Sequence, residues 1–220
     1  MGTAELTYSD RLSVFINSLD KGNTEFLNRL EKQAKTDGIP IIRRETQSMI
    51  KFLLGVKQPR SVLEIGTAVG FSAILMCTYG PDGMNLTTIE DYDERIPAAL
   101  ENIKNAGMTD RIHILNGDAN DILPGLKEKY DMIFVDAAKA QYINYLPDVI
   151  RLLDEGGIMV ADNCLQDGDI LESKFAVERR NRTIHKRMRE FLYSIKNDDR
   201  LVTSIIPSGD GMALSVKRTR

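Results

Sequence analysis

Hydrophobic and polar positions follow two different patterns along this chain. Up to about residue 57 the apolar positions recur every three or four residues, which is the period of amphipathic helices. Asn23 is suited to cap a second helix, and a third is predicted over residues 45–56. The first helix is marked by Leu12, Phe15, Ile16 and Leu19. The N-terminal part is therefore predicted to be helical.

From Arg60 onward, short β-branched runs alternate with helical stretches. Strands are predicted over residues 61–65, 84–90, 111–115, 130–136 and 157–162. Helices are predicted over residues 71–79, 92–106, 120–129, 139–153 and 175–196. Strands that alternate with helices form a parallel sheet with helices on both faces. Two last runs, 201–207 and 212–218, are joined by so short a turn that they must pair antiparallel. We expect an α/β fold with five parallel strands and a C-terminal antiparallel hairpin.

Length and cysteine content narrow the class of protein. The 220 residues suit one domain, 1–220, with helices over 1–57 and the sheet core over 58–220. No window holds 18 consecutive apolar residues, and acids stand where a secretory signal needs a basic and then an apolar stretch, so neither a membrane span nor export is expected. Cys77 and Cys164 are too few for a disulfide framework, which favours a reducing cytoplasm.

Acidic residues and glycines follow the first three predicted strands, where open α/β sheets bind ligands. Strand one runs into E-x-G-x-x-x-G, from Glu64 to Gly70, in which glycine lets the backbone approach a ligand and the acid suits a cationic amine. Glu90 ends strand two and can accept from ribose hydroxyls. Asp118 and the backbone of Ala119 follow strand three and suit an adenine amino group. Together these features describe S-adenosylmethionine; the alternative is glycines that only pack and acids that only cap helices.

Strands four and five end in a second polar group. Asp136 and Lys139 follow strand four, and Asp162 and Asn163 follow strand five. Two carboxylates and an amide offer the oxygen ligands that Mg²⁺ prefers, whereas zinc would favour nitrogen or sulfur. A nearby cation would stabilise a substrate oxyanion, and Lys139 could accept the hydroxyl proton as a general base. The alternatives are a turn or helix cap for Asp162 and Asn163, and a solvated side chain for Lys139.

These motifs resemble those of the class I S-adenosylmethionine-dependent methyltransferases, and within them the metal-dependent O-methyltransferases that include the catechol and caffeoyl-CoA enzymes. The resemblance spans about residues 40–218 and implies a Rossmann-like, seven-stranded methyltransferase sheet. It implies that Lys139 is the general base and that Asp136 is both a catalytic and a cofactor-binding residue. It further implies the methionine portion of the cofactor at Glu64, Gly66 and Ser72, its ribose at Glu90, its adenine at Asp118 and Ala119, and metal ligands at Asp136, Asp162 and Asn163.

Charge is distributed unevenly along the chain, although its net value is only −3. Residues 176–220 carry a net charge of +6 and residues 1–175 a net charge of −9. Within the last predicted helix, one face collects basic side chains that suit a phosphate track, namely Arg179, Arg182, Lys186 and Arg189. A solvated helix face is the alternative.

A closer resemblance concerns the substrate. Residues 56–74, 136–142 and 205–218, together with the basic helix, resemble bacterial tRNA 5-hydroxyuridine methyltransferases, which make 5-methoxyuridine at the wobble position. This resemblance implies tRNA, through its anticodon region, as the partner. Methylation of a small catechol-like or acyl-CoA substrate is a second hypothesis, and a non-catalytic nucleotide- or S-adenosylmethionine-binding module is a third. The family often forms dimers, and the apolar positions of the N-terminal helices suit an interface, so a homodimer is expected.

Several other side chains have two interpretations each. His113 is expected to be buried or at a sheet edge, and His185 to belong to the basic helix. Tyr142 and Tyr145 either line a substrate pocket or pack at helical spacing. Arg43 and its neighbour Arg44 follow a break at Gly38–Pro40 and could meet a phosphate.

Overall fold

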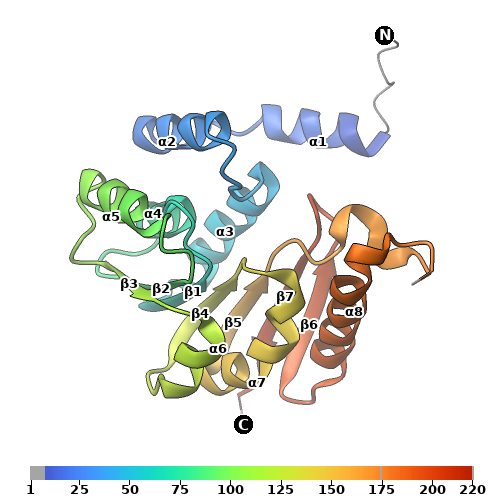
Figure 1. Ribbon diagram of the computed structural model, residues 1–220. Helices are drawn as coiled ribbons and strands as arrows, with labels where there is room; N and C mark the ends of the chain where they lie inside the picture. Colours follow the sequence, from blue (N-terminus) through green and yellow to red (C-terminus); the bar gives the residue numbers. More distant parts are fainter. Residues whose placement is uncertain (1–7, 174, 220) are drawn as a thin grey trace.

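The computed structural model describes residues 8–173 and 175–219, and a seven-stranded sheet runs through its centre (Figure 1). The strand order is β3-β2-β1-β4-β5-β7-β6; the first five strands of the chain pair in parallel, and β7 is antiparallel to both β5 and β6. The α/β fold expected from the sequence is therefore confirmed. The strands are β1 (Ser61–Ile65), β2 (Asn85–Glu90), β3 (Ile112–Asn116), β4 (Tyr130–Val135), β5 (Leu153–Ala161), β6 (Leu201–Ile206) and β7 (Met212–Lys217).

Helices cover both faces of the sheet. One face is covered by α3 (Arg44–Lys57), α4 (Phe71–Tyr79) and α5 (Ile96–Asn105). Outside them, α2 (Glu25–Thr36) packs against α4, and α1 (Tyr8–Ser18) lies beside it and contacts α3 (Figure 1). The other face is covered by α6 (Ala119–Ile122), α7 (Tyr142–Leu152) and α8 (Arg182–Asn197). Four short 3₁₀ turns complete the described part: η1 (Leu123–Gly125), η2 (Lys139–Gln141), η3 (Gln166–Leu171) and η4 (Arg179–Asn181).

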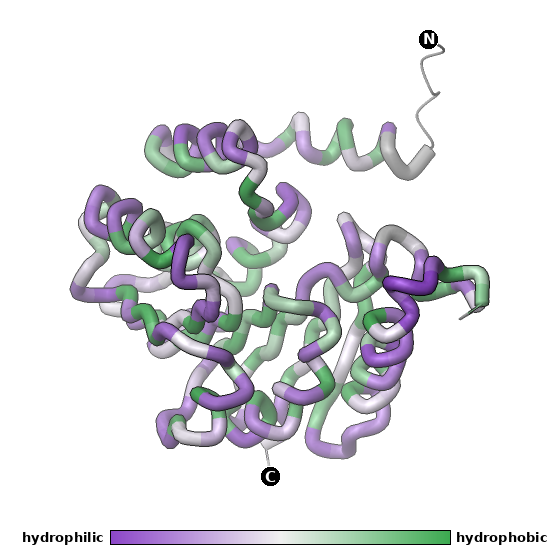
Figure 2. The backbone as a smooth tube through the Cα atoms, in the orientation of Figure 1, coloured by the Kyte–Doolittle hydropathy of each residue, from purple (hydrophilic) through white to green (hydrophobic). Residues whose placement is uncertain are grey.

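The sheet separates two hydrophobic cores because successive side chains of a strand point to opposite faces. In β4, for example, Met132 and Phe134 pack with α3 and α4, whereas Ile133 and Val135 pack with α7 and α8. These strands are apolar on both faces, as expected for parallel strands covered by helices, and Figure 2 shows hydrophobic residues concentrated along them. The continuous apolar runs in the sequence are thereby explained.

Several predicted elements differ from the structure. The strand predicted over 157–162 begins at Leu153, and the helix predicted over 92–106 begins at Ile96. Thr24, not Asn23, caps α2: its hydroxyl accepts from Leu27 N, while the Asn23 amide donates to Gln47. The helix predicted over 120–129 is only α6 followed by η1, because Pro124 has no N–H to continue an α-helix. The helix predicted over 175–196 becomes regular only at Arg182, whose guanidinium bonds the carbonyl oxygens of Phe175 and Val177 and holds the preceding chain in a turn.

The helix α1 makes few contacts with the rest of the fold. Asn17 donates a hydrogen bond to Glu45, and four apolar side chains of α1 stay more than 40% exposed: Leu12, Val14, Phe15 and Ile16.

Cys77 and Cys164 are both buried and unpaired. None of the described helices is both long and apolar enough to cross a membrane.

Candidate active site

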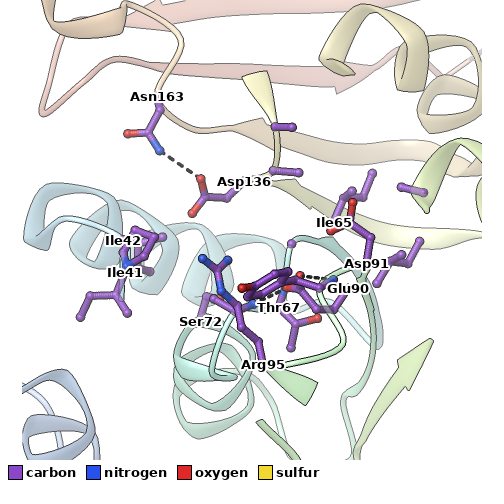
Figure 3. A pocket seen from close by; sticks show the side chains of 18 of the residues that line it. Ile41, Ile42, Ile65, Thr67, Ser72, Glu90, Asp91, Arg95, Asp136 and Asn163 are labelled. Atoms are coloured by element: carbon purple, nitrogen blue, oxygen red, sulfur yellow. Dashed lines mark hydrogen bonds between the residues drawn. The ribbon is translucent and has the colours of Figure 1, made fainter. Parts of the chain in front are cut away.

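A pocket of about 740 Å³ opens at the carboxyl ends of the parallel strands (Figure 3). It lies where the strand order reverses between β1 and β4, which is the place where open α/β sheets bind ligands. Of the predicted site residues, the pocket wall includes Gly66, Ser72, Glu90, Ala119, Asp136, Lys139 and Asn163. The sheet topology thus brings together residues that lie almost one hundred positions apart.

Gly66 is required where β1 approaches the end of β4. Its φ is +103°, and a Cβ atom there would lie 2.1 Å from the carbonyl oxygen of Asp136. The loop that follows is held by Glu90, whose Oε2 accepts from the amides of Thr67 (3.0 Å) and Ala68 (2.7 Å). Ala68 itself has a φ of +47°, which is uncommon for a residue with a side chain. Glu90 therefore both lines the pocket and fixes the backbone that forms it.

Glu64 lies beneath the pocket rather than on its wall. Its carboxylate is fully buried and accepts a 2.6 Å hydrogen bond from the Thr88 hydroxyl. Burial, together with the negative charges of Asp136 and Glu90, raises the pKa of Glu64 to about 7, although the hydroxyls of Ser72 and Thr88 oppose the rise. Ser72 on α4 lies between this carboxylate and the pocket, so Ser72 is the member of the pair that a ligand would meet first.

Asp118 has a local structural role. It is the N-cap of α6, its Oδ1 accepts from Asn120 N at 2.8 Å, and its side chain is exposed. The neighbouring residues Gly117 and Ala119 line the pocket, whereas Asp118 does not. The wall at this point is therefore backbone and a methyl group.

The ends of β4 and β5 bring two carboxylates and an amide together. The Asn163 amide donates to Asp136 Oδ1 at 3.0 Å (Figure 3). Asp162 Oδ1 accepts from the Thr46 hydroxyl at 3.1 Å and from Asn163 N. Asp162 Oδ2 is buried and has no hydrogen-bond partner among the described residues. Asn163 has a φ of +56°, a strained conformation that Asn tolerates better than most residues.

This cluster fits a divalent cation. Burial, followed by the charge of Asp162, raises the pKa of Asp136 to about 6, and burial also raises the pKa of Asp162. The unpartnered, buried Oδ2 of Asp162, near the second carboxylate of Asp136, is costly unless a cation neutralises it. No three His, Cys, Asp or Glu side chains cluster as a metal site in the part of the chain described, so a cation here would need the Asn163 amide as a third ligand.

Lys139 forms an ion pair that the sequence did not indicate. Its Nζ lies 3.0 Å from Asp210 Oδ2 in the turn between β6 and β7, and the Asp210 side chain is only 2% exposed. The amide of Leu165 donates to the Asp210 carbonyl, and that of Cys164 to the Gly211 carbonyl, so this turn is tied to the segment that follows Asn163. The C-terminal hairpin thereby reaches the pocket.

The wall of the main pocket also contains residues that the sequence analysis did not name, and others for which it gave two interpretations. Asp91, Tyr92 and Arg95 line the pocket after β2; only the position directly after Glu90 could have suggested them. Arg43, one of the two basic residues considered from the sequence, lines the pocket. Of the two interpretations given for the tyrosines, pocket wall and helix packing, each holds for one of them. Tyr145 lines the pocket, whereas Tyr142 is buried, bonds the carbonyls of Val135 and Asp162, and packs its ring edge-on against Phe191.

The predicted basic face is only partly formed. Arg179, Arg182 and Lys186 line a second pocket between α7 and α8, but Arg189 instead donates to the carbonyl of Ile170. His185 is buried and its Nε2 lies 3.1 Å from the Glu172 carbonyl, so it anchors a loop and is not part of the basic surface. His113 is exposed on β3, the strand at one edge of the sheet.

The strand order, the terminal hairpin and the pocket at the switch point define a methyltransferase-type α/β protein. The family model described as O-methyltransferase matches residues 17–218, which is most of the chain. The chain belongs to the O-methyltransferase family.

Individual relatives agree with this assignment. A catechol O-methyltransferase of Niastella koreensis is 38% identical over 127 residues; the match covers 56% of this chain and spans only 58% of that protein's length. A caffeoyl-CoA O-methyltransferase of Citrus natsudaidai is 30% identical over 167 residues, or 73% of this chain and 72% of that one. The crystal structure of an SAH-bound Podospora anserina methyltransferase has a TM-score of 0.87 at 24% identity, covering all of both chains, and shows the same fold.

Proposed function

We propose that this chain is an S-adenosylmethionine-dependent, divalent-metal-dependent O-methyltransferase. The observation that carries the proposal is a pair of raised-pKa carboxylates at the switch point of an O-methyltransferase fold. Asp136 lines the pocket, and Asp162 lies buried behind it with an unpartnered carboxylate oxygen. A sensor that only binds a nucleotide has no use for such a cluster. Catalysis is therefore favoured over the non-catalytic module.

The cofactor would lie along the loop after β1. Glu90 would accept from the ribose hydroxyls while it continues to hold the loop amides of Thr67 and Ala68. Gly66 and Ser72 would flank the methionine portion, with Glu64 acting from beneath. The adenine would contact the backbone of Ala119, with Asp118 at the pocket's outer edge.

Asp136, Asp162 and Asn163 would hold the cation, for which Mg²⁺ suits an all-oxygen ligand set. When bound, the cation supplies Lewis-acid stabilisation of a substrate hydroxyl as it loses its proton. Lys139 would accept that proton, and Asp210 holds the Lys139 ammonium at the pocket wall. The pocket contributes in-line positioning of the two reactants, which is the entropic part of catalysis.

The proposed substrate is 5-hydroxyuridine of tRNA at the wobble position, giving 5-methoxyuridine. Its 5-hydroxyl and adjacent 4-carbonyl form the kind of oxygen pair that chelates a divalent cation. The basic residues Arg179, Arg182 and Lys186 support an RNA partner, because they line one pocket together. A small catechol-like or acyl-CoA substrate is the second candidate, favoured by the names of the relatives in Niastella koreensis and Citrus natsudaidai.

A direct assay separates these substrates. Purified protein would be incubated with methyl-labelled S-adenosylmethionine and Mg²⁺ and offered 5-hydroxyuridine-containing tRNA, 3,4-dihydroxybenzoate or caffeoyl-CoA. Nucleoside mass spectrometry should show 5-methoxyuridine, and EDTA should abolish it. Transfer to the small molecules alone would reject the tRNA substrate, and transfer that persists in EDTA would reject the metal.

The proposed assembly is a homodimer in the cytoplasm. Apolar side chains on the outer helices are exposed and suit an interface between two copies: Leu12, Val14, Phe15, Ile16 and Leu19, with Phe52 and Val56 on α3. Light scattering should give twice the chain mass of 24.7 kDa; a particle of 24.7 kDa would refute the dimer.

A further inference from the structure

The second pocket lies between α7 and α8, which pack side by side (Figure 1). Its volume is about 730 Å³, and its wall carries four basic side chains, Arg179, Arg182, Lys186 and Arg187, against one acidic side chain, Glu190. The whole protein carries a net charge of −3, so this concentration of positive charge is local. Guanidinium groups gathered in a hollow suit phosphate, whose oxygens accept paired hydrogen bonds from them.

The positive charge of this pocket is largely uncompensated. Glu190 lies 3.5 Å from Lys186, and it is the only carboxylate among the described residues of the wall. Arg182 and Arg187 bond carbonyl oxygens, which fix the direction of a guanidinium without neutralising it. Arg179 is exposed and has no ion pair within the described ranges. An anion entering the pocket would therefore meet three guanidinium groups, of Arg179, Arg182 and Arg187, that pair with no carboxylate among the described residues of the wall.

The pocket is also connected to the main site. Arg187 Nη1 donates to the carbonyl of Ala140 at 3.1 Å, and Ala140 follows Lys139 in the η2 turn. Lys139 lines the main pocket, while Ile143 and Asn144, one turn further on, line the second. A single η2–α7 segment thus separates the two pockets. A substrate that places its hydroxyl at Lys139 and continues over this segment would bring its next charged group to the arginines of the second pocket.

We propose that this pocket is a phosphate subsite for the RNA backbone next to the modified nucleotide. The inference rests on the proposed tRNA substrate and refines it, because it assigns the contact to Arg179, Arg182, Lys186 and Arg187 and excludes Arg189, which is directed at the Ile170 carbonyl. An RNA strand supplies a phosphate at every nucleotide, so one phosphate reaches the pocket whichever base neighbours the target.

The test is RNA affinity as a function of salt, measured by fluorescence anisotropy with a labelled tRNA anticodon stem-loop. The pocket variant is the double substitution Arg179→Ala and Lys186→Ala, two exposed residues whose removal leaves the buried contacts of α8 in place. The control is Lys104→Ala with Lys127→Ala, which removes the same charge from exposed positions outside both pockets. Thermal unfolding of each variant checks the fold.

We expect the pocket variant to bind RNA roughly tenfold more weakly, with a log–log salt slope smaller by about 1.4 to 1.8, because each lost phosphate contact removes about 0.7 to 0.9. The control should match the unmodified protein. Equal losses in both variants would overturn the subsite, since only net charge would then matter, and so would an unchanged slope in the pocket variant.

Two further outcomes separate this inference from the proposed function. RNA binding does not depend on turnover, so a protein that binds the stem-loop through the pocket without methylating it would support the subsite and reject the proposed reaction. If the unmodified protein binds no RNA and the pocket variant instead raises KM for caffeoyl-CoA, the phosphate belongs to coenzyme A, and the RNA proposal is overturned.

Discussion

The ammonium of Lys139 lies 3.0 Å from the carboxylate of Asp210, a side chain that is almost completely buried in the turn between β6 and β7. The two residues are 71 positions apart and meet because β7 pairs with β5, which lies next to β4 in the sheet. Asp210 also adds to the negative charge around Asp162. The C-terminal hairpin is therefore part of the candidate site.

Replacing Asp210 with Asn tests whether it positions Lys139. We expect kcat to fall by about tenfold or more with little change in KM, because the amine loses its fixed direction at the pocket. Asp82→Asn, on an exposed loop, is the control. An unchanged kcat, or a rise in KM as large as the fall in kcat, would show that Asp210 does not position Lys139.

Replacing Asp162 with Ala tests the metal site. Turnover should be abolished and Mg²⁺ affinity, measured by calorimetry, should fall by roughly a hundredfold or more, because the buried carboxylate between Thr46 and Asn163 is lost. Asp136→Ala should behave the same way. Affinity for S-adenosylmethionine should change little. Full activity of either variant would remove these carboxylates from the mechanism.

Replacing Glu90 with Ala should produce the opposite pattern. S-adenosylmethionine affinity should fall by roughly tenfold or more, because the ribose loses its acceptor and the amides of Thr67 and Ala68 lose theirs. Mg²⁺ affinity should stay within twofold of the unmodified protein. If calorimetry shows that the metal affinity falls and the cofactor affinity does not, the two halves of the site have been assigned wrongly.

The buried carboxyl of Glu64 should make the free energy of unfolding depend on pH. Its pKa is raised from 4.5 to about 7, so its neutral form is favoured in the fold, and its contribution to stability is lost as the pH rises from about 4.5 through 7. Glu64→Gln removes this loss. Urea unfolding at pH 8 should find the variant more stable than the unmodified protein by about 3 kcal/mol without cofactor, and at pH 4 the two should agree within 1 kcal/mol. The same difference at both pH values would contradict the prediction.

Alanine substitutions at Gly66 and Gly83 distinguish the cost of backbone strain from the cost of a steric clash. Both have a positive φ, but a Cβ atom at Gly66 would meet the Asp136 carbonyl, whereas nothing lies within 4 Å at Gly83. Gly83→Ala should cost about 1 kcal/mol of unfolding free energy, which is the usual left-handed penalty. Gly66→Ala should cost clearly more and abolish cofactor binding. Equal costs would mean that the approach of β1 to β4 is adaptable.

The sequence by itself determined the order and type of the sheet elements, because burial on both faces enforces continuous apolar runs such as residues 132–135 and short loops enforce antiparallel pairing. It also indicated the acids after each strand, since parallel strands align their carboxyl ends at one edge of a sheet. It could not place helix starts that depend on distant side chains, such as that of α8, where Arg182 bonds two carbonyls of the preceding loop.

Only the tertiary structure decided which of these residues face one another. It placed Glu64 under the pocket, gave Asp118 to a helix cap, and directed Arg189 away from the basic pocket that Arg187 joins. The contact between Lys139 and Asp210 depends on the register of β7 against β5, which local sequence does not encode. Spacing along the chain determines the face of a strand or helix, but side-chain direction and partnership depend on packing between elements that are remote in sequence.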